Sequence, residues 1–204
     1  MSDIPVNLAI EDELSEVVLR RLLAHSRRGY HVGTAYRKGG FGYLRRTVVG
    51  WNRAAQGIPF VILTDLDDHT CPRSLIDEWL TEPQHQNLVF RIAVREVEAW
   101  LLADSENLST YLAVRESFVP GEPEILVDPK GALIDLARAS RSARVRDQIV
   151  PRRGSTAKQG PGYNGCLAGF VATHWDIRAA SVRSPSLARA MRRLAGFRPT
   201  WLHK

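Results

Sequence analysis

Two aspartates, Asp65 and Asp67, follow a short and strongly apolar run, residues 60–63. In an extended chain, residues two apart point to the same side, so these carboxylates would lie together. Two close carboxylates repel each other unless a cation shares them, and Mg²⁺ takes one or two carboxylates together with water and phosphate oxygens. The spacing therefore indicates a divalent-metal site. The alternative is that these acids cap the next helix or lie in a loop, and this is what we expect for Asp68.

Carboxylates follow two further predicted strands in the same way. Glu11 comes directly after the apolar segment 6–10, and Glu96 and Glu98 follow the segment 87–94. In an open α/β sheet, ligands bind at the carboxyl ends of the strands. If these strands are neighbours, the acids lie at one edge of the sheet and can serve one or two metal ions. Three strands that end in acids favour a shared site over three separate caps.

The elements that would position these acids alternate along the chain. Short apolar runs precede segments with the period of an amphipathic helix up to residue 105. This alternation predicts an α/β fold of the Rossmann-like kind, with a mostly parallel four-stranded sheet covered by helices on both faces. The glycine-rich segment 38–42 matches no phosphate-binding loop pattern and is expected to be a flexible turn. The expected strands are residues 6–10, 30–36, 60–63 and 87–94.

The pattern changes after residue 105. Residues 106–204 are expected to be helical and to pack on or extend the core of residues 1–105. Residues 1–128 contain 13 Lys and Arg against 19 Asp and Glu, a balance of −6, whereas residues 129–204 contain 15 against 3, a balance of +12. A basic segment beside an acidic pocket suits a metal-dependent enzyme that acts on a polyanion. A solvated basic surface is the alternative interpretation.

Much of this positive charge lies between residues 141 and 158. Basic side chains bind the phosphates of nucleic acids without reading their sequence. Lys130 either stabilises charge that develops on a phosphate or is an ordinary surface lysine after a proline turn. The residues expected to follow the backbone of DNA or RNA are Arg141, Arg144, Arg146, Arg152, Arg153 and Lys158.

The composition argues against several other classes of protein. A chain of 204 residues with 44% hydrophobic residues can bury a core of its own. Its two cysteines, Cys71 and Cys166, form no CxxC pair, so neither a zinc site nor a disulfide framework is expected. No apolar run approaches the roughly 20 residues that span a bilayer, and the N-terminus lacks the features of a signal peptide. We therefore expect a cytoplasmic protein without membrane contact.

Taken together, these motifs resemble a known family. A strand that ends in Glu, followed by a later strand that ends in Asp-x-Asp, is the acidic signature of the Toprim domain of topoisomerases, primases and OLD-family nucleases. More narrowly, the chain is similar to the DUF4276-type Toprim-like family. The stretches that carry this likeness are Ile10-Glu-Asp-Glu-Leu-Ser-Glu16, Leu63-Thr-Asp-Leu-Asp67, Arg95-Glu-Val-Glu-Ala-Trp-Leu-Leu-Ala-Asp104 and Asp128-Pro-Lys130.

The resemblance implies roles for individual residues. Glu11 would bind metal or act as a general acid or base, and Glu98 would complete a second metal site. Toprim domains usually have Gly after the glutamate, where this chain has Asp12. The implied metal ligands are Glu11, Asp65, Asp67, Glu96, Glu98 and Glu16. The implied catalytic residues are Glu11, Asp65, Asp67, Glu98 and Lys130.

The implied activity is phosphodiester hydrolysis of DNA or RNA, with Mg²⁺ or Mn²⁺ as cofactor. Two metal ions roughly 4 Å apart can activate water, neutralise the phosphate and assist the leaving oxygen. Members of the family often lie beside ATPases in phage-defence loci, so the resemblance also implies a defence effector that works with a partner ATPase. The sequence does not decide whether the chain forms a homo-oligomer. The alternatives are a non-catalytic Toprim-like module that binds nucleic acid or a partner protein, which Asp12 favours, and an enzyme that acts on small phosphoesters.

Overall fold

The computed structural model describes residues 3–200, which belong to two compact units. The first unit comprises Met1–Val94 and Ala188–Lys204, and the second comprises Arg95–Leu187. The expected division after residue 105 differs from this one in two ways. Residues 95–105 belong to the second unit, because helix α4 (Val97–Leu102) contacts helices of that unit. Residues 188–200 return to the first unit.

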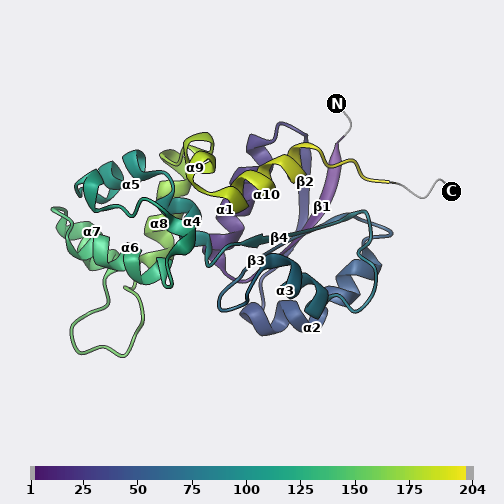
Figure 1. The fold of residues 1–204 in the computed structure, drawn as a ribbon, viewed down its shortest axis with the longest axis horizontal. Coiled ribbons are helices and arrows are strands. Elements are labelled where there is room, and N and C mark those ends of the chain that lie inside the picture. The colour runs from purple at the N-terminus through teal and green to yellow at the C-terminus, as the bar shows by residue number, and fades with distance from the viewer. Residues whose placement is uncertain (1–2, 201–204) are drawn as a thin grey trace. The chain divides into compact units, whose positions relative to one another are not determined.

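The first unit contains a four-stranded sheet in which every pairing is parallel. The strand order is β2-β1-β3-β4, so β1 and β3 are central neighbours. The expected α/β class with a mostly parallel, Rossmann-like sheet is therefore confirmed (Figure 1). The strands are β1 (Ile4–Ile10), β2 (Tyr30–Tyr36), β3 (Phe60–Asp65) and β4 (Leu88–Ala93).

Helices α2 (Gly40–Ala54) and α3 (Pro72–Trp79) cover one face of this sheet. Trp51 of α2 and Trp79 of α3 are buried there against apolar strand residues. Strand residues alternate between the two faces, and those on this face form one continuous apolar core with the helices. The strand residues of this core are Ala9, Phe60, Ile62, Leu88, Phe90 and Ile92.

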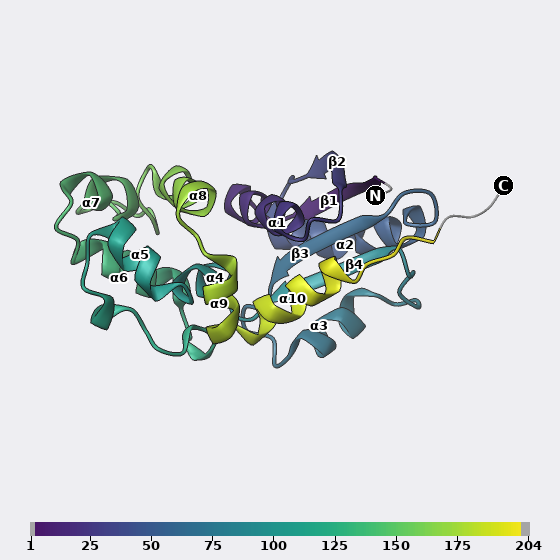
Figure 2. The ribbon, with the colours of Figure 1, turned by 90° about the horizontal axis from the view of Figure 1, so that it is seen from above.

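Helix α1 (Glu13–His25) covers the opposite face, together with the part of α10 (Pro185–Ala195) that belongs to this unit. Figures 1 and 2 show both helices on the side of the sheet away from α2 and α3. The Tyr30 hydroxyl donates a hydrogen bond to the Leu194 carbonyl at 2.7 Å, and the Tyr30 ring stacks on Phe197. The C-terminal segment is thus a structural part of the α/β unit.

The second unit is helical and contains no strand within Arg95–Leu187. Buried aromatic side chains form its core, among them Trp100, whose indole nitrogen donates to the Ser186 hydroxyl at 2.6 Å. Within residues 3–200, no helix combines the length and apolar character needed to cross a membrane. Besides α4, the elements of the second unit are α5 (Ser105–Leu112), the short 3-10 turns Glu116–Phe118 and Pro123–Ile125, α6 (Pro129–Arg138), α7 (Ala143–Ile149), α8 (Tyr163–Thr173), α9 (Ile177–Arg183) and the start of α10.

Two expected segments differ from the structure. The glycine segment 38–42 is partly helical, because α2 begins at Gly40 and is preceded by Gly39 in a left-handed conformation with φ of 84°. The expected helical part 106–204 is interrupted, for example between Thr173 and Ile177, where the Asp176 side chain caps a new helix. In both cases, turn chemistry decided where the helix begins.

Candidate functional site

Glu11 is held at the carboxyl end of two central strands. It follows β1 directly, and Ile10 is paired in register with Leu63 of β3. The Thr64 hydroxyl and the Asp65 backbone N–H both donate to Glu11 Oε1, the latter at 3.0 Å. The expectation that the first and third strands are neighbours, with their acids at the same edge, is therefore confirmed.

Burial and neighbouring groups act on the charge of Glu11. Burial raises its pKa, the hydrogen bonds from Thr64 and Asp65 lower it, and the negative charges of Asp67 and Asp12 raise it again. The negative charge of Asp67 is thus one of the smaller influences on the Glu11 carboxyl group. A divalent cation between the two carboxylates would replace repulsion by attraction, and the donors are the carboxylate oxygens that Mg²⁺ prefers.

Asp65 and Asp67 are not caps of the next helix. Asp65 is the last residue of β3 and is paired with Ala93 of β4. Asp67 lies in the following turn with φ of 48°, in the left-handed region that Asp tolerates better than most residues. The N-cap of α3 is Cys71, whose sulfur accepts the Ser74 N–H. The cap interpretation of these two acids is therefore wrong.

Two other acids near Glu11 have structural partners. Asp12 is the N-cap of α1, and its Oδ1 accepts the Ser15 N–H at 2.8 Å. Glu16, an implied metal ligand, forms ion pairs with Arg20 at 2.9 Å and Arg37 at 3.3 Å. A cation at Glu16 would have to displace those arginines. No group of three or more His, Cys, Asp or Glu side chains among residues 3–200 has the geometry of a metal site.

Glu98 and Lys130 form a polar cluster within the second unit. Glu98 is only 3% exposed, and its Oε1 accepts the Tyr163 hydroxyl at 2.8 Å. Lys130 Nζ lies 3.5 Å from the same oxygen and 5.5 Å from the centre of the Tyr163 ring. Lys130 is therefore neither a plain surface lysine nor a free cation. Tyr163 was missed in the sequence, because it starts α8, far along the chain from α4.

Glu96 adds a second carboxylate to this cluster. Its Oε2 accepts the backbone N–H of Lys130 at 2.8 Å. Burial raises the pKa of Glu96 to about 7, and the nearby Glu98 raises it as well, while the hydrogen bond from Lys130 opposes the shift. A carboxyl group with this pKa exchanges a proton near neutral pH, as a general acid or base must.

The residues expected to contact nucleic acid lie on α7 and in the segments on either side of it. Arg146 is partly buried, and its guanidinium donates to the Ser140 carbonyl, so it has a structural partner. The others are exposed on the second unit, as a backbone-binding role requires. They are Arg141, Arg144, Arg152, Arg153 and Lys158.

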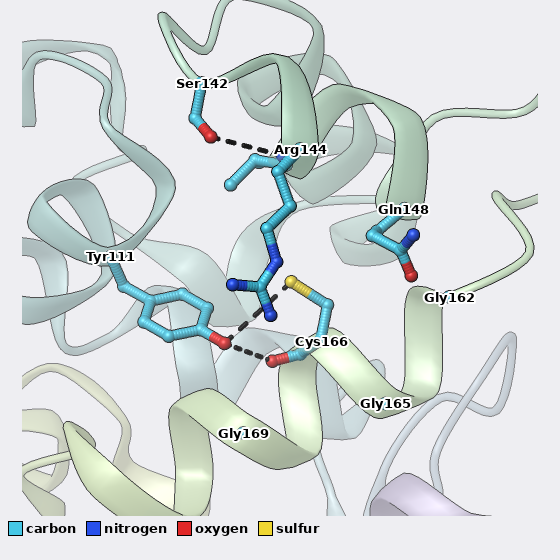
Figure 3. A pocket seen from close by; sticks show the side chains of 9 residues that line it. Tyr111, Ser142, Arg144, Gln148, Gly162, Gly165, Cys166 and Gly169 are labelled. Atoms are coloured by element: carbon cyan, nitrogen blue, oxygen red, sulfur yellow. Dashed lines mark hydrogen bonds between the residues drawn. The ribbon is translucent and has the colours of Figure 1, made fainter.

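Arg144 lies in a pocket of about 380 Å³ between α5, α7 and α8 (Figure 3). The Tyr111 hydroxyl donates to the Cys166 carbonyl at 2.8 Å on one side of it. A Cβ atom at Gly165 would meet no other atom within 4 Å, so the space beside this glycine is open. Burial raises the pKa of the Cys166 thiol, which therefore stays protonated at neutral pH.

Comparison of the chain with protein-family models, curated proteins and solved structures gives no match. The likeness to the DUF4276-type Toprim-like family thus stays a prediction made from motifs.

Proposed function

We propose that this protein is a Mg²⁺- or Mn²⁺-dependent phosphodiesterase that hydrolyses nucleic acid. The observation that carries the proposal is the fixed position of Glu11, whose Oε1 is bound by Thr64 and Asp65 at the ends of β1 and β3. Asp67 lies close enough to act on its charge. This arrangement agrees with the Toprim-like motif in the sequence.

In this proposal, Glu11, Asp65 and Asp67 hold the metal. Oε1 of Glu11 is engaged by the protein, so Oε2 is the oxygen offered to the cation. Mg²⁺ needs only one or two carboxylates when water and substrate phosphate complete its shell. The bound metal would supply charge neutralisation for the phosphate and an activated water.

The second unit contributes charge and proton exchange. Its exposed arginines attract a polyanion, and Glu96 can carry a proton near neutral pH. Together with the family likeness, this extends the proposal to a cytoplasmic phage-defence effector whose ATPase is supplied by a partner chain.

A cleavage assay tests the proposal. The purified chain is stripped with EDTA and given Mg²⁺ or Mn²⁺ with single-stranded DNA, double-stranded DNA or RNA. We expect metal-dependent cleavage, and Glu11→Gln and Asp65→Asn each reduce its rate by about 100-fold. Gln at position 11 still accepts the bonds from Thr64 and Asp65, so the local fold is kept.

Asp68→Asn is the matched control, because Asp68 lies in the same turn and has no role in the proposed site. It is expected to cleave at the wild-type rate. Full activity of both Glu11→Gln and Asp65→Asn with every substrate would refute the assignment of the site.

A second candidate is a module that binds nucleic acid without cleaving it. Asp12 favours this candidate, because it occupies the position of the usual Toprim glycine and serves as a helix cap. The module predicts binding that EDTA does not change, and no cleavage with any divalent metal. Metal-dependent cleavage that Glu11→Gln abolishes would exclude it.

A further inference from the structure

Strand β4 carries an arginine where the fold calls for an apolar residue. Arg91 alternates with Phe90 and Ile92, which face the α2 and α3 core, so it lies on the opposite face of the sheet. On that face it is paired in register with Leu63 of β3. Its neighbours along the same face of the strand, Val89 and Ala93, are fully buried. An arginine in such a row costs free energy unless something compensates its charge.

Part of the Arg91 guanidinium lacks a partner among the described residues. The Nε of Arg91 is buried and has no hydrogen-bond partner among residues 3–200. Burial lowers the pKa of Arg91, and the positive charges of Arg189 and Arg193 lower it further. These two are one turn apart on α10, which Figure 2 shows overlying β4. Two like charges thus act on the half-buried guanidinium of Arg91.

The position of α10 does not by itself bring every arginine of this helix close to Arg91. Arg192, also on α10, lies instead beside Leu22 and His25 of α1 and does not act on Arg91. A methionine or leucine at position 91 would extend the apolar row at no electrostatic cost. Residues that break the rules of burial and charge pairing occur chiefly at functional sites, where a ligand supplies what the protein lacks.

We propose that Arg91, Arg189 and Arg193 form an oxyanion site that binds the phosphate group of a nucleotide or nucleic acid. Guanidinium groups present planar pairs of N–H donors that match phosphate oxygens two at a time. A phosphate among them would accept from the buried Nε–H of Arg91 and offset the repulsion of Arg91 by Arg189 and by Arg193. The site lies within the first unit, and it stands whether or not the chain cleaves its ligand.

Thermal unfolding tests the site with inorganic phosphate as the probe. Wild type and Arg91→Met are compared in sodium phosphate and in sodium chloride at equal ionic strength and pH, with EDTA present. Phosphate raises the Tm of folded proteins without binding at a site, so the quantity compared is the increase in Tm when phosphate replaces chloride. Wild type is expected to show a larger increase than Arg91→Met, and equal increases in the two proteins would overturn the proposal.

A binding assay identifies the source of the phosphate. It also avoids a substitution within the sheet, which could disturb the fold as well as the site. Fluorescence anisotropy of a labelled single-stranded oligonucleotide is measured in EDTA for Arg189→Gln with Arg193→Gln, two surface changes. The matched control is Arg192→Gln with Arg198→Gln, which removes the same charge from the same exposed segment. The site variant is expected to bind about tenfold more weakly than the control variant.

Equal affinity of the two double variants would show a general charge effect and refute the site. Competition by dAMP against the oligonucleotide assigns the site to a terminal phosphate, whereas binding of the oligonucleotide alone assigns it to the backbone. Glu11→Gln is expected to keep its binding in both cases. A failure of cleavage is thereby separated from a failure of this site.

Discussion

Carboxylates that look alike in the sequence have different partners in the structure. Glu11 is held by Thr64 and a strand N–H, whereas Glu16 is neutralised by arginines. Glu98 is buried against Tyr163 and Lys130. Among these three glutamates, Glu11 follows a central strand directly, and its recorded hydrogen bonds come from a hydroxyl and a backbone N–H. The proposed metal site is therefore placed at Glu11, Asp65 and Asp67.

Loss of the Tyr163 hydroxyl should destabilise the chain. Tyr163→Phe leaves the buried Glu98 carboxylate without its 2.8 Å donor, and such a loss costs about 1–3 kcal/mol. Urea unfolding measures the change. Tyr111→Phe is the control, because the hydroxyl it removes donates to a backbone carbonyl in a less buried place. A larger loss in the control than in Tyr163→Phe would contradict the account.

The raised pKa of Glu96 predicts a pH-dependent stability. Since its pKa rises from 4.5 to about 7 on folding, the folded state binds more protons than the unfolded state between these values. The free energy of unfolding therefore falls as pH rises through this window and levels off above pH 7. In EDTA, Glu96→Gln should gain stability relative to wild type from pH 5 to pH 8. A difference that is constant with pH would contradict the shift.

Strands β1, β3 and β4 were predictable because each is a short apolar run between turn signals. The sequence did not predict the order of the strands, but the expected neighbourhood of the first and third strands is confirmed by the pairing of Ile10 with Leu63. The ends of helices were less predictable, since they depend on single caps such as Cys71 and Asp176. The strand-end acids were therefore found, but their hydrogen bonds were not.

The cap of α1 gives a prediction at the scale of one helix. Asp12→Ala removes the acceptor for the Ser15 N–H and should cost about 1 kcal/mol of unfolding free energy, whereas Asp12→Gly should cost only a few tenths. Denaturant unfolding measures both. Asp12→Gly also restores the usual Toprim residue, so we expect its metal-dependent cleavage to equal or exceed that of wild type. A Gly variant as unstable as the Ala variant would contradict the capping role.

Contacts between distant parts of the chain were beyond the reach of sequence patterns. Tyr163 meets Glu98 across 65 residues, and Arg193 acts on Arg91 from the far end of the chain. The return of residues 188–200 to the α/β unit is of the same kind. Asn87 exchanges hydrogen bonds with Thr200 at 2.7 and 2.8 Å, and the Arg28 guanidinium donates to the Phe197 carbonyl at 2.9 Å. Each needs the tertiary fold, which local periodicity does not encode.

The C-terminal segment should therefore be required for the α/β unit to fold. In the whole chain, Leu194 and Phe197 are each only 1% exposed, because they pack on the α/β unit. A fragment of residues 1–105 lacks both side chains and therefore exposes the surface that they cover. We expect it to lack a cooperative unfolding transition by circular dichroism. Residues 1–94 joined by a flexible linker to residues 188–204 should unfold cooperatively. Cooperative unfolding of the 1–105 fragment alone would contradict the division into units.

The central claim is that Glu11, Asp65 and Asp67 hold a divalent metal. Calorimetric titration of the EDTA-stripped chain with Mn²⁺ tests it without any substrate. The account predicts binding with a dissociation constant at or below the low-millimolar range in wild type and Asp68→Asn, and its loss in Glu11→Gln and Asp65→Asn. Absence of binding in wild type, or equal binding in all four proteins, would contradict it.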